Sequence, residues 1–177
     1  MKRIALILAA TFPVMAFAAS QNTITFNGQV TDQTCTVAVN GNAASPMILL
    51  PTVSATSLSA ANSKAGETPF TVSISGCTAP SSTALAIKTA FLGNNGTSAG
   101  NLGSSGTATN VQIQLLSAPA GTAIVLEGVT SVAGLVLPSA QTETSHDFAA
   151  QYVSETGGAT AGTVTAVSYT HLTLPTS

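Results

Sequence analysis

Residues 68–77 read TPFTVSISGC, and this stretch decides the fold. Its apolar residues Phe70, Val72 and Ile74 alternate with Thr and Ser, which is the pattern of a strand with one face in a core. The segment then delivers Cys77, in a chain whose one other cysteine is Cys35. The stretch predicts a core strand that ends at a residue able to cross-link it.

The same alternation recurs outward from this strand, in short segments separated by Gly, Asn, Ser and Thr. Further strands are predicted at residues 23–31, 34–39, 84–92, 111–116, 123–126, 146–153 and 162–169. Residues 52–67 and 93–110 are small and polar and are predicted as loops. Seven or eight strands without a credible helix favour an all-β sandwich with Greek-key connections.

The composition allows one domain and points to a secreted protein. The chain has 177 residues, of which 45% are apolar, enough for a single core. Charged residues make up only 6%, against roughly 25% in ordinary globular domains. A surface wetted by Ser, Thr, Asn and Gln indicates a protein that packs against copies or partners.

The first eighteen residues predict a secretory signal peptide. Lys2 and Arg3 precede an apolar run, and Ala16-Phe17-Ala18 fits the small-x-small rule for cleavage after Ala18. The alternative is a membrane anchor, but the run is shorter than the ~20 residues that a spanning helix needs. Pro13 also interrupts it.

Export changes the net charge of the chain and places both cysteines in an oxidising compartment. After cleavage the chain keeps two lysines against six acids, a net charge of −4, which argues against nucleic acid as a partner. Two cysteines in an oxidising compartment predict one disulfide, Cys35 to Cys77, worth about 4 kcal/mol in the chain-entropy model. A redox or metal site is the alternative, but the sequence has neither C-x-x-C nor a histidine near the cysteines.

No pattern in the sequence indicates catalysis. His146 and Asp147 are adjacent, but neighbours in a strand point to opposite faces, so they cannot form one constellation, and a solvated strand end is expected. Nucleophile-elbow, zinc-protease and phosphate-loop motifs are absent from the sequence. We therefore expect no enzyme, no catalytic residues, no cofactor and no metal.

An ordered set of segments carries a family resemblance. The set is NTITFNGQVTDQTCTV, ILLPTVS, AGETPFTVSISGC, TAFLG, ATNVQIQLL and FAAQYVSETGGATAGTVTA, running from Asn22 to Ala166. In this order, with this cysteine spacing, it resembles the major pilin subunits of chaperone-usher fimbriae of the type 1 kind. The resemblance implies an incomplete immunoglobulin-like β-sandwich that lacks its last strand.

The family also implies partners, because the missing strand leaves an apolar groove beside unpaired backbone. A periplasmic chaperone fills the groove first, an outer-membrane usher assembles the subunits, and the N-terminal extension of the next subunit replaces the chaperone strand. The expected assembly is a homopolymer of identical or related pilins.

The segment before Cys35 fits the donor role. Ile24, Phe26 and Val30 share one face of residues 19–31, and no charge would have to be desolvated there. Gly28 matches the position where the family keeps a small residue, which allows two backbones to approach closely. The alternative is an ordinary edge strand that folds onto its own domain.

The last residues are expected to border the groove and do not finish as the family would. Gly162 and Val164 begin the final strand and are predicted at the acceptor groove and the edge gripped by the chaperone. From residue 167 on, VSYTHLTLPTS loses the alternation and brings in Pro175, and it resembles a translated transposon-end sequencing adapter. We expect residues 167–177 to be a non-native tail that does not complete the strand.

The sequence thus predicts a structural subunit of a surface fimbria that supports adhesion. Its parts are a signal peptide (1–18), a donor-strand extension (19–31), a pilin domain (32–166) and the tail (167–177). The alternative function is that of a minor adaptor or tip pilin acting as a binding module.

Overall fold

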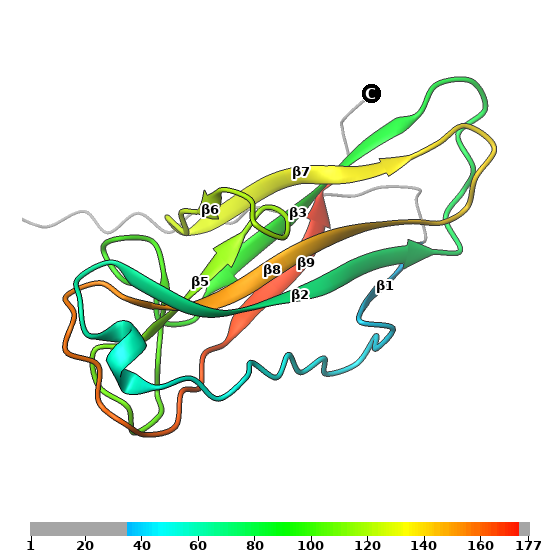
Figure 1. Ribbon diagram of the computed structural model, residues 1–177. Helices are drawn as coiled ribbons and strands as arrows, with labels where there is room; N and C mark the ends of the chain where they lie inside the picture. The colour runs from blue at the N-terminus through cyan, green and yellow to red at the C-terminus, as the bar shows by residue number, and fades with distance from the viewer. Residues whose placement is uncertain (1–34, 174–177) are drawn as a thin grey trace, which may run out of the picture.

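The computed structural model describes residues 35–173 and shows two facing antiparallel sheets (Figure 1). The strands are β1 (Thr36–Val39), β2 (Ser63–Ser75), β3 (Leu85–Gly93), β4 (Leu102–Gly103), β5 (Gln112–Leu116), β6 (Ala123–Ile124), β7 (Val129–Leu137), β8 (Thr144–Ser154) and β9 (Ser168–Thr173). A single turn of 3₁₀ helix, η1 (Ala55–Leu58), precedes β2. The larger sheet has the order β1-β2-β8-β5-β4, with β6 also on β5, and the smaller has the order β7-β3-β9. The predicted β-sandwich is confirmed.

Three phenylalanines join the two sheets. Phe148 on β8 is fully buried and stacks on Phe70 of β2 at 5.7 Å between ring centroids. The ring of Phe91, on β3 of the smaller sheet, meets the Phe148 ring edge-on at 5.2 Å. Such aromatic pairs add about 0.5–1.5 kcal/mol each beyond their buried area. Phe70 belongs to the stretch 68–77, whose predicted inward face is confirmed, since Val72 and Ile74 are also buried.

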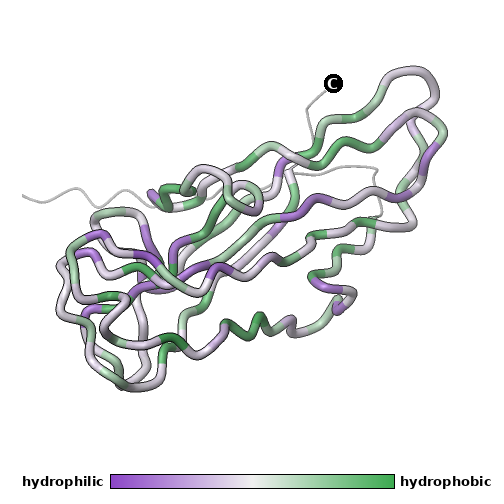
Figure 2. Tube along the Cα trace, viewed as in Figure 1, coloured by the Kyte–Doolittle hydropathy of each residue, from purple (hydrophilic) through white to green (hydrophobic). Residues whose placement is uncertain are grey.

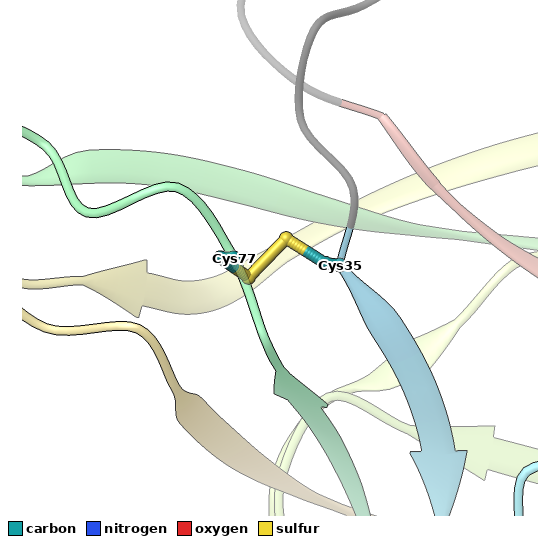
Figure 3. The surroundings of a disulfide bond; sticks show 2 residues. All are labelled: Cys35 and Cys77. Carbon is teal, nitrogen blue, oxygen red and sulfur yellow. A yellow bond between two sulfur atoms is a disulfide. The ribbon is translucent and has the colours of Figure 1, made fainter.

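The disulfide fixes the start of the sandwich. Cys35 and Cys77 are joined with 2.10 Å between the sulfur atoms, next to the pair Thr36 and Ser75 where β1 meets β2 (Figure 3). The predicted bridge is confirmed. It holds Cys35, four residues after the end of the proposed extension, against the core, because Cys77 is itself buried.

Three elements inside the chain differ from the sequence prediction. The predicted loop 93–110 contains the two-residue strand β4, and β2 and β7 each contain a bulge. The predicted loop 52–67 contains η1 and the first five residues of β2, whose register to β8 shifts between Ala65 and Thr68. All of β7 was missed, because Gly134 is an extra residue opposite the shift between Ile87 and Lys88 of β3. An extra residue breaks the period of two that marks a strand, so the pattern of buried residues changes phase within the element.

The final strand also differs from expectation. The predicted strand 162–169 is displaced, since β9 begins at Ser168 and pairs with β3 from Gly93 back to Lys88. The expectation that the tail at residues 167–177 would not complete the strand was wrong for residues 168–173, which pair with β3 as β9. The pairing does not bring burial with it, because no residue of β9 is fully buried.

The prediction for His146 was half right. His146 and Asp147 do point apart, since the ring Nε2 of His146 lies 2.8 Å from the carbonyl oxygen of Ser117 while Thr71 donates to the Asp147 carboxylate at 2.6 Å. The expected solvation of His146 was wrong, because its ring packs on Phe148 and over Gly134, where a Cβ would lie 2.6 Å from the ring.

Within residues 35–173 no helix is long and apolar enough to cross a membrane.

Candidate functional site

The candidate site is one open edge of the sandwich, where both sheets end. In the smaller sheet β9 pairs only with β3 among the described strands, and in the larger sheet β1 pairs only with β2. Figure 1 shows β1 and the long connection from β1 to η1 on the side of the sandwich away from β7. We call this side the open edge; it comprises β1, residues 46–53 and residues 162–173.

Apolar side chains line the open edge without being fully covered. Seven of them pack on the main core and remain half-buried: Val37, Val39, Ile48, Leu50, Val164, Ala166 and Leu172. A half-covered apolar row beside two strands that are each paired on one side only is an incomplete core. One additional strand with an apolar face would cover it.

Residues 46–53 form one wall of the open edge. Ile48 and Leu50 are half-buried, whereas Met47 and Leu49 are 77% and 78% exposed, so residues 47–50 alternate as a strand does. Val53 is half-buried as well. Figure 2 shows the apolar part of this connection as a continuous green stretch. Its backbone makes no hydrogen bond to another described residue, so its N–H and C=O groups are available to a strand laid beside it.

Strand β9 forms the opposite wall, and its side chains suit that position poorly. Thr170 lies across from Phe91, whose side chain is in the core, so Ser168, Thr170 and Leu172 share the inward face. Only Leu172 among them is apolar. Tyr169, which would cover far more core surface, is 58% exposed on the outward face.

The two predicted acceptor residues lie just before β9. Val164 is half-buried and packs on both the main core and a small cluster around Leu58. Gly162 presses against the backbone of Thr107 and Ala108, which leaves no room for a Cβ. This close approach aligns residues 104–110 with 158–165, where the N–H of Ala108 donates to Thr163 and that of Ser105 to Thr165.

The predicted donor residues Ile24, Phe26, Gly28 and Val30 lie outside the described residues, as does the predicted signal peptide. Sequence analysis did not single out the wall at residues 46–53. A signal was present, since Pro46 and Pro51 bracket the apolar run, and proline in a strand-like run is typical of an edge.

Polar side chains of the described residues gather in one cluster, which holds no set of metal ligands. No three His, Cys, Asp or Glu side chains between residues 35 and 173 are close enough to hold a metal ion. The most buried polar cluster joins Glu155 to Thr97 and Asn101 by hydrogen bonds of 2.6 and 2.7 Å. Gln114 extends the chain of bonds from Asn101 to Gln151, so the cluster ties the 94–101 loop to the larger sheet.

Known proteins share both the sequence and the fold. The chain is 41% identical over 157 residues to the F17 fimbrial protein of Escherichia coli, covering 83% of this chain and 84% of that protein. It is 39% identical over 109 residues to the major fimbrial subunit SMF-1 of Stenotrophomonas maltophilia (strain K279a), covering 62% of this chain and 63% of that one.

Two solved structures have the same fold. A subunit from the structure of a chaperone-usher pilus superimposes with a TM-score of 0.59 at 20% identity, covering 94% of this chain and 100% of that one. The P pilus rod subunit PapA gives the same TM-score and identity, covering 79% of this chain and 99% of that one. The family model for fimbrial proteins matches residues 24–173, and the chain belongs to the fimbrial protein family.

Proposed function

We infer that this protein is a structural subunit of a surface fimbria, exported through the periplasm to the cell surface, which polymerises and thereby supports adhesion. The open edge is the observation that carries this function, because an incomplete core needs a strand from elsewhere. A structural rather than an enzymatic role agrees with the family, whose members named above are fimbrial proteins and pilus subunits.

The mechanism that we propose is donor-strand complementation. Residues 19–31 of one subunit lie between residues 46–53 and β9 of the next, with Ile24, Phe26 and Val30 facing the half-buried apolar row. Backbone pairing on both sides supplies affinity, and the apolar contacts supply register. Gly28 allows the two backbones to approach at the narrowest point.

The same edge explains the need for the remaining partners. Before assembly an unpaired edge with apolar side chains would aggregate, so a periplasmic chaperone covers it and an outer-membrane usher exchanges it for the donor strand. The domain boundaries that we propose are a signal peptide at 1–18, the donor at 19–31, the pilin domain from 32 to 166, and a non-native tail from 167, whose residues 168–173 occupy the place of the last strand as β9.

A peptide tests the donor mechanism. A chain that starts at Asp32 is melted with and without a synthetic peptide of residues 20–31. At a peptide concentration 1,000 times its Kd, binding should add about 4 kcal/mol and raise Tm by roughly 10 °C.

The control peptide carries Phe26→Asp and Gly28→Asp and should leave Tm unchanged, because a carboxylate would be buried without a partner. An unchanged Tm with the unaltered peptide would mean that the domain is already complete. The protein would then be a self-contained binding module.

The alternative role of a minor adaptor or tip pilin differs in abundance. A major subunit makes up most of purified fimbriae, whereas an adaptor is a trace component. The similarity to a protein named as a major fimbrial subunit favours the first role. The ratio of this protein to the other pilins, measured by mass spectrometry of sheared fimbriae, decides between them.

A further inference from the structure

Glu155, directly after β8, holds the loop between β3 and β4 on the larger sheet. Its carboxylate accepts hydrogen bonds from the Thr97 hydroxyl at 2.6 Å and from the Asn101 side-chain amide at 2.7 Å. Asn101 is only 4% exposed, so its bond to the carboxylate is sheltered from water. Hydrogen bonds to a charged group are stronger than those between neutral groups. We call these three residues the Glu155 anchor.

The Glu155 anchor is itself fixed to both neighbouring strands of the larger sheet. The backbone N–H of Glu155 donates to the side-chain oxygen of Gln112 on β5 at 3.2 Å. Gln114, also on β5, donates to Asn101 at 3.1 Å and accepts from Gln151 of β8 at 2.9 Å. The anchor therefore cannot shift without breaking hydrogen bonds to the sheet.

The loop that the anchor holds is closed on itself and leads into Ser104. The N–H of Thr97 donates to the carbonyl of Asn101 at 2.8 Å, and the N–H of Gly103 donates to the carbonyl of Asn95 at 2.6 Å. Gly103 lies so close to Asn95 that a Cβ would stand 2.7 Å from the Asn95 carbonyl oxygen. Ser104, the next residue, thus starts from a fixed position.

Ser104 and Ser105 hold the backbone of Thr165. The N–H of Ser105 donates to the carbonyl of Thr165 at 2.8 Å, and the N–H of Thr165 donates to the hydroxyl of Ser104 at 3.2 Å. Thr165 lies between Val164 and Ala166, whose half-buried side chains belong to the apolar row of the open edge. A path of bonded segments therefore leads from the Glu155 anchor to that row.

We propose that Glu155 is a positioning residue for the binding of the donor strand. Its hydrogen bonds go to the loop and to β5, so its effect on the open edge passes through the loop. By fixing the loop, it holds Val164 and Ala166 where the apolar face of an incoming strand meets them. A groove that is ordered beforehand binds more tightly, because less freedom is lost on binding. The inference rests on the proposed donor-strand function, and every residue of the path precedes the proposed tail.

Removal of the carboxylate tests this role on the full chain. A fluorescent peptide of residues 20–31 is titrated with the chain, at concentrations too low for chains to assemble. Glu155→Ala should weaken peptide binding at least ~5-fold, because coupling through a packed path changes affinity by factors of this size. Glu155→Gln keeps an acceptor oxygen for the loop and should recover most of the affinity.

The matched control is Asp147→Ala. Asp147 on β8 accepts a 2.6 Å hydrogen bond from the Thr71 hydroxyl on β2, outside the loop and the open edge. The variant therefore loses the same charge and a hydrogen bond of the same kind, and it should bind the peptide as the unaltered chain does. Equal weakening in both variants would reduce the effect to general destabilisation and overturn the proposal, as would unchanged binding by Glu155→Ala.

A double-mutant cycle separates positioning from a merely structural role. When Glu155→Ala is combined with Val164→Ala, the loss of affinity should be smaller than the product of the two single losses, because the anchor then has less to position. When it is combined with Ile48→Ala, on the wall at residues 46–53, the single losses should multiply. Multiplication in both combinations, or equal coupling in both, would contradict the positioning role.

Thr97 offers the same test from the other side of the bond. If Glu155→Ala does not fold, Thr97→Val removes the donating hydroxyl and takes its place in every comparison, with Thr97→Ser as the variant that keeps the hydroxyl. Failure of the proposed function looks different, since the peptide would then not bind the unaltered chain either, and both proposals would fall together.

Discussion

Thr89 is the residue whose surroundings fit it least. It is fully buried on the inward face of β3, and its Oγ1 has no hydrogen-bond partner among the described residues. A buried hydroxyl without a partner costs roughly 1–3 kcal/mol relative to one that is paired. Its methyl group, in contrast, suits the apolar core, so the free-energy cost comes from the Oγ1 atom alone.

Replacing Thr89 by Val should therefore stabilise the domain. Thr89→Val keeps the shape of the side chain and removes the unpaired hydroxyl, so the free energy of unfolding should rise by about 1 kcal/mol. Urea unfolding of the full chain measures the change. Thr89→Ser is the control, since it keeps the hydroxyl and loses the methyl group, and it should lower stability. A loss of stability in Thr89→Val would show that the hydroxyl is satisfied in solution.

At the scale of elements, regular alternation could be predicted and its interruptions could not. The strand that contains Phe70, Val72 and Ile74 could be predicted, because every second residue is buried in the core without interruption. Strand β7 could not be found in this way, because Gly134 is an extra residue that breaks the alternation. It lies against the ring of His146 on β8, where a side chain would not fit. That contact depends on the packing of β7 on β8, which no local pattern contains.

The candidate site could likewise be predicted only in part. The sequence shows Ile48 and Leu50 only as part of an apolar run. Their role as one wall of the open edge depends on β9, which forms the opposite wall. Gly162 was expected from the resemblance to begin the final strand, but it lies in the segment before β9. Its tight packing on residues 107 and 108 could not be predicted, because it joins two loops that lie far apart in the sequence.

Strand β9 has its largest apolar side chain on the wrong face for a groove wall. Its inward residues are Ser168, Thr170 and Leu172, and Tyr169 points outward. We therefore expect the gene, re-read on unfragmented genomic DNA, to carry different codons after Ala166. Those codons should place apolar residues at positions 168, 170 and 172, since every second residue of the last strand must cover the core. The same codons as in this sequence would contradict the proposed tail.

At the scale of the whole molecule, the contact that we propose for assembly lies on one side of the sandwich. The open edge is the surface proposed for the neighbour along the fibre. That surface needs few charges, because the side chains that line it are apolar. The low charged fraction of 6% suits such an assembly.

The scarcity and placement of lysine also bear on proteolysis. Trypsin cuts only after Lys or Arg, and between residues 35 and 173 it meets just Lys64 and Lys88. Lys64 pairs with Val153 on β8, and Lys88 lies in β3 between Ala133 and Thr173 on its two neighbouring strands. A protease needs its site in an opened chain, so cleavage must wait for one of these strands to leave its sheet.

Native fimbriae should consequently stay intact in trypsin for as long as the sandwich remains closed, whereas unfolded chains should be cut at both lysines. Timed digestion followed by mass spectrometry measures this, and rapid native cleavage after Lys88 would show that β9 opens readily. The strands that give the fibre its strength thus also remove it from the reach of a whole class of digestive enzymes.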